Sequence, residues 1–447
     1  MLVLIFVCIV CVFVIEILWR IRKQRLEGSQ PPLYPGAWPI VGHALVVVDV
    51  DLWTLVEKIS RYTSKVGGVI RFYSLWWRYY FVTDPEDALT ILNQSFAKSY
   101  IYSFANEWIG NGLVTADVPN WKRNRKLFNR AFTQRTLNTF LDVFNKQSRR
   151  LVNQLSAENG KGKFDPYWYI INNVLETSNE TILGLKSEEN SMVDKDYAYE
   201  VTTLFDMIVE RIQNPLMHLS LLYYMSEHKT VLDFALEHFK ESEGFTDDDI
   251  RQHLETFVIG SFDSTTSTLV YALNEIGADP IVQEKISKEL KEVFEEIDRD
   301  VHKEDLSKLI YLDAVIKEIV RLYPAVPLIA RDLTSDVKLK NYTIPEGTTC
   351  ICSIYGINRH PSWGEDAGQF SPDRWLELKR STGPIFAGFG LGKRNCIGGQ
   401  YGMMSLKTML VHILRRYRIK ADNTKGKSKF NVFLKPASGY DIEIILR

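Results

Sequence analysis

Few cysteines and almost no net charge characterise this sequence. Five cysteines occur in 447 residues, at positions 8, 11, 350, 352 and 396. They are too few and too unevenly spaced for a disulfide framework, which favours a reducing compartment. The formal net charge is −1, so the overall composition gives no sign of a nucleic-acid partner. Internal repeats and low-complexity tracts are lacking as well.

Apolar residues, in contrast, are plentiful enough for a large core. Hydrophobic residues make up 45% of the chain and charged residues 24%, which is typical of globular proteins. Strand signals occur in residues 69–86 and in 337–355, where a Pro-Glu-Gly turn predicts a hairpin. Helical periodicity covers residues 120–157, 198–240, 246–276, 280–297, 306–323 and 399–416. We therefore expect one large domain over 41–447, mainly α-helical with small β-sheets.

The first 40 residues differ from the rest of the chain. Residues 2–19 are apolar except for Glu16, and a run of this length is within the range of a membrane-spanning helix. The basic stretch RIRKQR follows at residues 20–25, and the positive-inside rule keeps such a flank in the cytoplasm. We expect a transmembrane anchor over 1–19, a basic, proline-rich hinge over 20–40 and a cytosolic domain. The alternative is a buried core helix.

The stretch FAGFGLGKRNCIGGQ, residues 386–400, places one cysteine in a glycine-rich loop. A phosphate-binding loop would need a glycine and a hydroxyl where Ala387 and Arg394 stand, and a dinucleotide fingerprint needs its third glycine where Lys393 or Asn395 stands. Zinc needs clustered ligands, and a cysteine nucleophile needs a histidine base, for which no local signature exists. A lone thiolate in such a cradle suits axial ligation of haem iron, because glycines let the backbone approach a flat macrocycle closely.

The same loop resembles the signature of a known family. FGLGKRNCIG fits the pattern Phe-x-x-Gly-x-Arg-x-Cys-x-Gly of the haem-thiolate monooxygenases, the cytochrome P-450 family. The matching residues are Phe389, Gly392, Arg394, Cys396 and Gly398. The resemblance covers nearly the whole chain and is nearest to microsomal, arthropod-type members of the family-four clan. It implies the cytochrome P-450 fold and a haem b whose iron is ligated by Cys396, with Phe389, Gly392 and Arg394 as cofactor-binding residues.

Further motifs carry the resemblance, in the order in which the family has them. WKRNR resembles its Trp-x-x-x-Arg motif and implies that Trp121 and Arg125 bind the haem propionates; the segment PLIARDLTSD implies the same for Arg331. KEIVR and FSPDRW resemble its Glu-x-x-Arg and Phe-x-Pro-x-Arg motifs and imply a structural ion triad that locks the loop of the haem ligand. The triad consists of Glu318, Arg321 and Arg374.

The segment TFVIGSFDSTTSTL resembles the family's oxygen-activating helix. Asp263 matches the acid of the family pattern, whereas Ser261 stands for a glycine and Ser264 for the usual catalytic threonine. The resemblance implies that Asp263, Ser264 and Thr265 are the catalytic residues that relay protons. Many family-four relatives link haem covalently through a glutamate where Gly260 stands, so we expect haem to be held without an ester.

The resemblance implies a monooxygenase that inserts one oxygen atom of O2 into an apolar lipid, terpenoid or xenobiotic. Electrons would come from NADPH through a separate flavoprotein, NADPH-cytochrome reductase, with a cytochrome b-type protein as a further donor. A basic surface around residues 122–135 suits an acidic flavoprotein, although a merely solvated helix face explains it as well. Membrane lipid of the endoplasmic reticulum would hold the anchor. The alternatives are a haem-thiolate isomerase and a catalytically impaired haem-binding paralogue or splice variant.

Two expectations depend on topology and length. If the domain is cytosolic, the sequons at Asn93, Asn179 and Asn341 stay unglycosylated. Only residues 240–245 separate the helical pattern that ends at 239 from the next segment, where relatives carry another helix and a basic loop. Six residues are too few for a helix and two turns. We expect a chain shortened around 240–246 and less stable than its relatives.

Overall fold

The computed structural model describes most of the chain. The described residues are 10, 11, 13, 14, 17, 30–38, 41–48, 50–185, 195–214, 247–294, 299–378 and 384–447. Most of the expected anchor over 1–19 and part of the hinge over 20–40 lie outside them, as does the expected shortening at 240–246. Within the described ranges, no helix has the length and apolar character needed to cross a bilayer.

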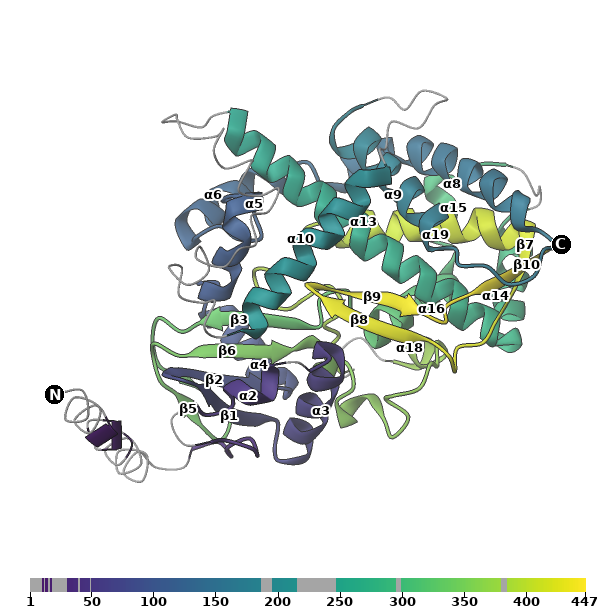
Figure 1. Ribbon diagram of the computed structural model, residues 1–447. Coiled ribbons are helices and arrows are strands. Elements are labelled where there is room, and N and C mark those ends of the chain that lie inside the picture. The colour runs from purple at the N-terminus through teal and green to yellow at the C-terminus, as the bar shows by residue number, and fades with distance from the viewer. Residues whose placement is uncertain are drawn as a thin grey trace.

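Long helices form the larger part of the molecule (Figure 1). The longest, α13, runs over Asp247–Ala278 through the middle of the fold and packs against α9 along much of its length. The other long helices are α8 (Leu141–Leu155), α9 (Tyr167–Ile182), α10 (Lys195–Gln213), α14 (Pro280–Val293), α16 (Ile310–Leu322) and α19 (Gly399–Arg416). Their apolar faces enclose the main core, in which Leu269, Ile316 and Leu410 have no exposed surface.

Shorter helices connect these elements with the sheet. They are α2 (Ala44–Val47), α3 (Leu52–Lys65), α4 (Pro85–Gln94), α5 (Asn106–Ile109), α6 (Val118–Phe128), α7 (Gln134–Thr139), α15 (Lys303–Leu306), α17 (Ile354–Ile357) and α18 (Arg374–Glu377). The local sequence explains where several helices begin. Asp84 before α4 and Asp279 before α14 each accept backbone N–H groups of the first turn, and a proline occupies the first helical position of both.

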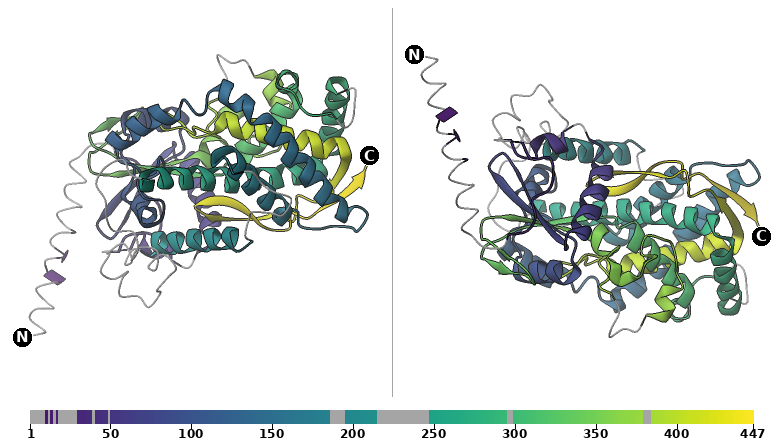
Figure 2. Two further views of the ribbon diagram at one scale, coloured as in Figure 1. Left: turned by 90° about the horizontal axis from the view of Figure 1, so that it is seen from above. Right: turned by 90° about the horizontal axis from the view of Figure 1, so that it is seen from below.

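A four-stranded sheet lies at the end of the molecule away from the C-terminus, as the views of Figures 1 and 2 agree. Its strand order is β1 (Val69–Ser74), β2 (Trp77–Val82), β6 (Thr349–Ser353) and β3 (Leu328–Asp332). Only the β2–β6 pair is parallel. Cys350 and Cys352 lie fully buried on β6 among apolar side chains, so they pack as small hydrophobic residues.

Three two-stranded sheets are also found among the described residues. They pair β4 (Val337–Lys338) with β5 (Thr343–Ile344), β7 (Tyr417–Ala421) with β10 (Ile442–Leu446), and β8 (Lys427–Asn431) with β9 (Phe433–Ser438). The β8–β9 hairpin matters for the site, because β9 packs on α13 and β8 packs on α3 and α10. The predicted architecture, mainly α-helical with small sheets, is thus confirmed.

Two predictions about single elements were wrong. The helix expected over 120–157 is divided into α6, α7 and α8, because the Thr133 hydroxyl accepts the N–H of Thr136 and caps a new helix at that point. The hairpin expected over 337–355 does not form, since β5 pairs with β4 whereas β6 lies between β2 and β3. The alternating pattern marked the strands but carried no information about their partners.

Candidate active site

The loop before α19 holds Cys396 through backbone hydrogen bonds. The N–H of Cys396 donates to the carbonyl of Phe389 at 2.8 Å, and the N–H of Asn395 donates to the carbonyl of Gly392 at 3.2 Å. Gly392 has φ 70°, and a Cβ there would lie 2.6 Å from the carbonyl oxygen of Leu92. Only glycine fits at this position, which explains one residue of the predicted motif.

The thiol of Cys396 differs from the other described thiols of the folded domain. Cys396 is exposed, whereas Cys350 and Cys352 are buried. Protein atoms nevertheless surround the Cys396 sulfur closely enough that burial raises its pKa, while a backbone hydrogen bond from Gly398 and the charge of Arg125 lower it. The helix that begins at 399 adds the positive end of its dipole. The sulfur therefore borders open space with groups beside it that favour a thiolate.

Helix α6 supplies two predicted residues to this loop. Arg125 donates from Nη1 to the carbonyl of Asn395 at 2.7 Å and from Nη2 to its side-chain oxygen at 3.2 Å. Trp121 is buried, and its ring centroid lies 4.6 Å from the guanidinium carbon of Arg394. The same ring stacks on Phe96, with the two ring centroids 5.9 Å apart. The structure thus brings Trp121 and Arg125 of α6 together with Arg394 around Cys396, although the helix and the loop are distant in the sequence.

Three cations gather beside this loop. They are Arg331 on β3, Arg394 in the loop and Lys98. Arg331 is buried, and its Nε has no hydrogen-bond partner in the described part of the chain. The Nε and Nη1 atoms of Arg394 are also buried without a partner there. Burial and the charge of Arg331 lower the pKa of Arg394 to about 10. Burial, Arg331 and Arg394 also lower the pKa of Lys98, which forms a backbone bridge with Arg331. Buried donors without partners favour an anionic ligand.

Lys98 is a residue that the sequence reasoning missed. It belongs to none of the recognised motifs, and its neighbours in the chain are ordinary. Only the pairing of its segment with β3 brings it beside Arg331.

The expected ion triad is present as a geometric unit. Arg321 donates from Nε and Nη2 to the two carboxylate oxygens of Glu318, each at 2.7 Å, and both side chains are fully buried. Arg374 donates to Glu318 at 2.9 Å, and the Ser371 N–H and the Trp375 ring N–H donate as well. Burial alone would raise the pKa of Glu318, but these donors outweigh it and hold the pKa below its usual range.

The predicted relay residues on α13 do not bond to one another. The Ser264 hydroxyl donates to the carbonyl of Gly260 at 2.6 Å, one turn earlier in the same helix. Asp263 is fully buried, and its carboxylate lies 3.0 Å from the ammonium of Lys435 on β9. Thr265 is buried. A Cβ on Gly260 would meet no atom within 4 Å, so this turn of α13 borders open space beside Gly260.

Comparison with known proteins identifies the family. The family model described as cytochrome P450 matches residues 31–242 and 225–444. The chain belongs to the cytochrome P450 family. Among curated relatives, cytochrome P450 4V2 of Mus musculus is 29% identical over 481 positions, covering 95% of this chain and 91% of the relative. Cytochrome P450 4c21 of Blattella germanica is 27% identical, covering 95% and 94%.

A solved structure agrees on the fold. The crystal structure of a cytochrome P450 (CYP102L1) superposes with a TM-score of 0.77 at 20% identity and covers 94% of this chain and 100% of that chain. The similarity to both vertebrate and insect members of family four supports the resemblance seen in the motifs. The enzyme class follows from the family, so the protein is a cytochrome P450 monooxygenase.

The residues of this cytochrome P450 fit a haem. Cys396 is exposed, and the unpartnered donors of Arg331 and Arg394 suit two propionates. When bound, haem would supply the chemistry of oxygen activation, which thiolate ligation favours by donating electron density.

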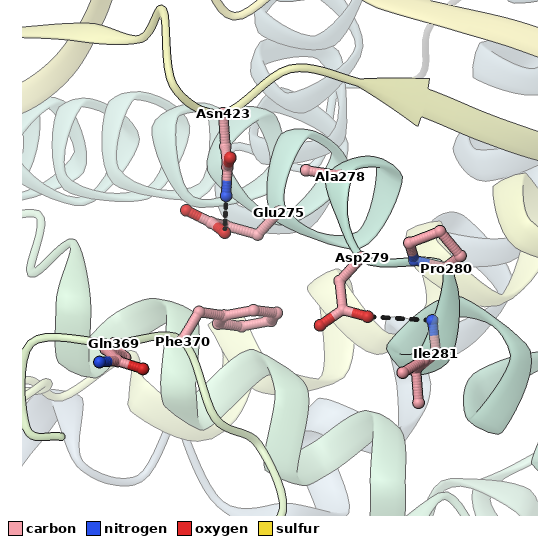
Figure 3. A pocket seen from close by; sticks show the side chains of 8 residues that line it. All are labelled: Glu275, Ala278, Asp279, Pro280, Ile281, Gln369, Phe370 and Asn423. Atoms are coloured by element: carbon pink, nitrogen blue, oxygen red, sulfur yellow. Dashed lines mark hydrogen bonds between the residues drawn. The ribbon is translucent and has the colours of Figure 1, made fainter.

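A surface cavity of about 520 Å³ lies elsewhere, between the end of α13 and the start of α14 (Figure 3). Its carboxylates already have partners. Asn423 donates to Glu275 at 2.8 Å, and Asp279 accepts the N–H of Ile281 at 2.9 Å. None of its lining residues belongs to the site around Cys396, so this cavity is not assigned a role in the reaction.

Proposed function

We propose that this cytochrome P450 uses a non-covalent haem b, ligated by Cys396, to insert one oxygen atom of O2 into an apolar lipid, terpenoid or xenobiotic. Electrons come from NADPH through a separate flavoprotein reductase, with a cytochrome b-type protein as a further donor. The observation that carries the proposal is the accessible Cys396 thiol beside cations whose buried donors lack partners. Burial raises the pKa of the thiol, and the Gly398 backbone and the charge of Arg125 oppose this effect. Phe389, Gly392 and the Cys396 N–H fix the loop.

The direct test is turnover with purified reductase, NADPH and a panel of apolar compounds. A monooxygenase consumes NADPH only with O2 and forms hydroxylated product. A haem-thiolate isomerase would convert its substrate without NADPH, and an impaired paralogue would show neither reaction. Either of these results would contradict the proposal.

Cofactor binding has its own test in the cation cluster. Arg394→Gln removes one charge and leaves Arg331 and Lys98 in place, so we expect haem affinity to fall about tenfold to a hundredfold, the range typical of lost supporting contacts at a cofactor. Haem transfer to apomyoglobin measures this loss. Arg130→Gln, on the exposed part of the chain after α6, serves as the control and should leave haem retention unchanged.

The haem is held without an ester in this proposal. Gly260 has no carboxylate that could form an ester. A Cβ added to this glycine would have no atom within 4 Å, so the space beside it is open. Acidic organic extraction of the purified protein should release all haem. Haem that stays with the polypeptide would contradict this part of the proposal.

The apolar substrate class is supported by side chains near the loop and α13. The Cδ1 atom of Ile329 on β3 lies 3.6 Å from the position that a Cβ on Gly390 would take, so Ile329 is next to the loop. Val326, just before the strand, is exposed. Phe257 packs against Phe128 and Phe132. Phe262, further along α13, is buried in the main core. Spectral shifts on titration with lipids and xenobiotics identify the ligands that enter.

We propose location at the endoplasmic reticulum membrane, with the anchor over 1–19 and the domain over 41–447 in the cytosol. Exposed Trp38, Leu45 and Trp76 support contact with membrane lipid. Trp38 and Trp76 are close to each other, because Trp38 pairs with Gly42 and Gly42 with Ser74. Membrane fractions should retain the protein after alkaline wash.

A cytosolic domain also predicts that the three sequons carry no glycan. Asn93 and Asn341 are exposed and thus available to the modifying enzyme if they reach the lumen. A mass shift that is sensitive to glycosidase, in insect or mammalian cells, would contradict the topology.

The basic face of α6 supports a reductase partner. Lys122, Arg123 and Lys126 are exposed on the helix whose Arg125 reaches the loop of Cys396. Such a surface favours association with an acidic protein, and salt weakens that attraction. The rate of first electron transfer should fall as ionic strength rises, and Lys126→Glu should lower it further. Rates that do not depend on salt would contradict the electrostatic partner surface.

An impaired paralogue or splice variant is the second candidate, and the alignment favours a shortened chain. The match to the Mus musculus relative extends over 481 positions, whereas 95% of 447 residues is about 425. The relative therefore has residues that this chain lacks, in keeping with the short connection at 240–246. We expect partial haem loss on purification and a lower melting temperature than that of a full-length relative. Full haem occupancy with ordinary turnover would contradict impairment.

A further inference from the structure

One buried ion pair joins α13 to the β8–β9 hairpin. The Lys435 ammonium on β9 lies 3.0 Å from Oδ2 of Asp263, and the two side chains are 6% and 0% exposed. Water screens such a pair very little, so each charge strongly affects the other. Lys435 thus touches the carboxylate that the sequence motif assigns to proton transfer.

Lys435 has a second neighbour on α10. Its ammonium lies 5.0 Å from the ring centroid of Phe205 on α10. Lys429 is the cross-strand partner of Lys435 and forms a separate ion pair, at 2.7 Å, with Asp206 on α10. The Lys429–Asp206 pair is solvent-exposed and therefore weak, so Lys429 lies on the same hairpin as Lys435 without determining where the Lys435 ammonium lies.

Asp263 depends on Lys435 for its charge balance. Apart from the Lys435 ammonium, no group in the described ranges bonds to its carboxylate oxygens. Burial raises the pKa of Asp263, and the Lys435 charge lowers it. Tyr167 at the start of α9 also faces Asp263, and its pKa is raised mainly by burial and further by the carboxylate charge. Without Lys435, the Asp263 carboxyl would hold its proton to higher pH.

We propose that Lys435 is a positioning residue for proton transfer, which keeps Asp263 ionisable and in place on α13. The β8–β9 hairpin and α10 are thereby coupled to the acid of the reaction. This inference rests on the proposed monooxygenase function. Lys435 itself contacts Asp263 and not the reacting atoms, so the test must separate its effect on the acid from a loss of structure.

The experiment compares Lys435→Met with Asp263→Asn and with the matched control Lys429→Met in the full-length, haem-loaded protein. The readout is product formed per NADPH consumed as a function of pH. We expect K435M to lower this yield about tenfold at neutral pH, which is less than the roughly hundredfold or more expected for complete loss of an acid–base group, because the Asp263 carboxyl is still present. The loss should shrink as the pH rises, because Asp263 then ionises again. D263N should lose yield at every pH, and K429M should keep the yield of the wild type.

Lys435→Arg keeps a cation at this position and should recover most of the yield. A second readout is thermal unfolding. D263N and K435M each leave a buried group without its partner, so the double variant should be more stable than the sum of the single losses predicts. This cycle needs no turnover, so it tests the ion pair even if the wild type forms no product and the proposed function fails.

Three results would overturn the proposal. One is a yield in K435M equal to that of the wild type at all pH values. Another is an equal loss in K429M, and the third is a loss in K435M that higher pH does not relieve. The last two would indicate a general disturbance of the hairpin. The red-shifted band of the reduced carbon monoxide complex, recorded for every variant, shows that the haem thiolate is intact in each comparison.

Discussion

The loop around Cys396 and the turn of α13 at residues 260–264 are built in opposite ways. In the loop, backbone groups bond to one another, and a side chain at Gly392 would collide with the carbonyl oxygen of Leu92. On α13, a side chain at Gly260 would meet nothing within 4 Å, and the Ser264 hydroxyl bonds only to its own helix. The loop around Cys396 is thus fixed by close contacts, whereas the turn of α13 at Gly260 has open space beside it.

The difference extends to the charges behind each region. On the loop side, Arg321 and Arg374 both bond to Glu318. Arg321 also donates to the carbonyl of Asn358, whose side-chain oxygen accepts the N–H of Ala387 at the start of the loop. The α13 side depends on one pair, Asp263 with Lys435. Because several bonds hold the loop side, we expect the position of Cys396 to vary little. Because Asp263 has a single charged partner, we expect its pKa and position to change when β9 moves.

The largest expected effect tests the loop side. Glu318→Gln leaves the buried Arg321 guanidinium without a carboxylate, whereas Arg374 keeps Asp366. We expect the free energy of unfolding to fall by about 3–5 kcal/mol. Denaturant unfolding of the haem-loaded protein measures this change. Lys285→Met breaks the exposed pair with Asp373 and should cost less than about 1 kcal/mol. Equal losses of unfolding free energy in both variants would show that the triad contributes no more to stability than an exposed ion pair.

The same residue predicts a pH dependence. The pKa of Glu318 is lowered in the folded protein, so its contribution to stability is complete above the unfolded value, near 4.3. It is lost as the pH falls through the lower, folded value. The stability difference between wild type and E318Q should therefore shrink on acidification. A difference that stays constant down to acid unfolding would contradict the assigned direction.

Paired glycine substitutions compare the two regions directly. Gly392→Ala forces a left-handed residue against the backbone of Leu92, and we expect a loss of at least about 3 kcal/mol together with poor haem incorporation. Gly260→Ala adds a methyl group in open space on a helix, which favours the folded state by up to about 1 kcal/mol. Thermal unfolding of both variants measures the contrast. Similar losses would remove the distinction between a packed loop and an open turn.

The smallest effect is expected at Ser264. Ser264→Ala removes the hydroxyl next to the open space, and we expect the yield of product per NADPH to fall about tenfold while stability stays near that of the wild type. Ser264→Thr keeps the hydroxyl and should retain the yield. Peroxide release, measured beside product, reports the electrons that are lost. An alanine variant with normal yield would exclude Ser264 from proton transfer.

Much of the loop side could be predicted from the sequence, because its residues lie in contiguous motifs. The helix expected over 399–416 has those bounds in α19, and the three residues of the triad meet as the resemblance implied. These motifs work because each sets a local geometry, such as the turn at Gly392 or the one-turn spacing of Glu318 and Arg321.

The other side could not be predicted in the same way. Lys98 and Lys435 belong to no motif and reach Arg331 and Asp263 only through strand pairing and packing of distant segments. The acid was recognised from its helix, but its partner lies on a hairpin near the C-terminus. A periodic pattern likewise did not reveal the break between α6 and α7, where the Thr133 side chain caps the start of the second helix.

The central claim is that Cys396 is the thiolate ligand of a haem iron. The reduced carbon monoxide complex of the full-length protein tests it most directly. We predict a strongly red-shifted Soret band for the wild type and for Cys350→Ser, whose thiol is buried in the apolar core beside the sheet, and no such band for Cys396→Ser. Retention of the red-shifted band in the Cys396→Ser variant would contradict the account.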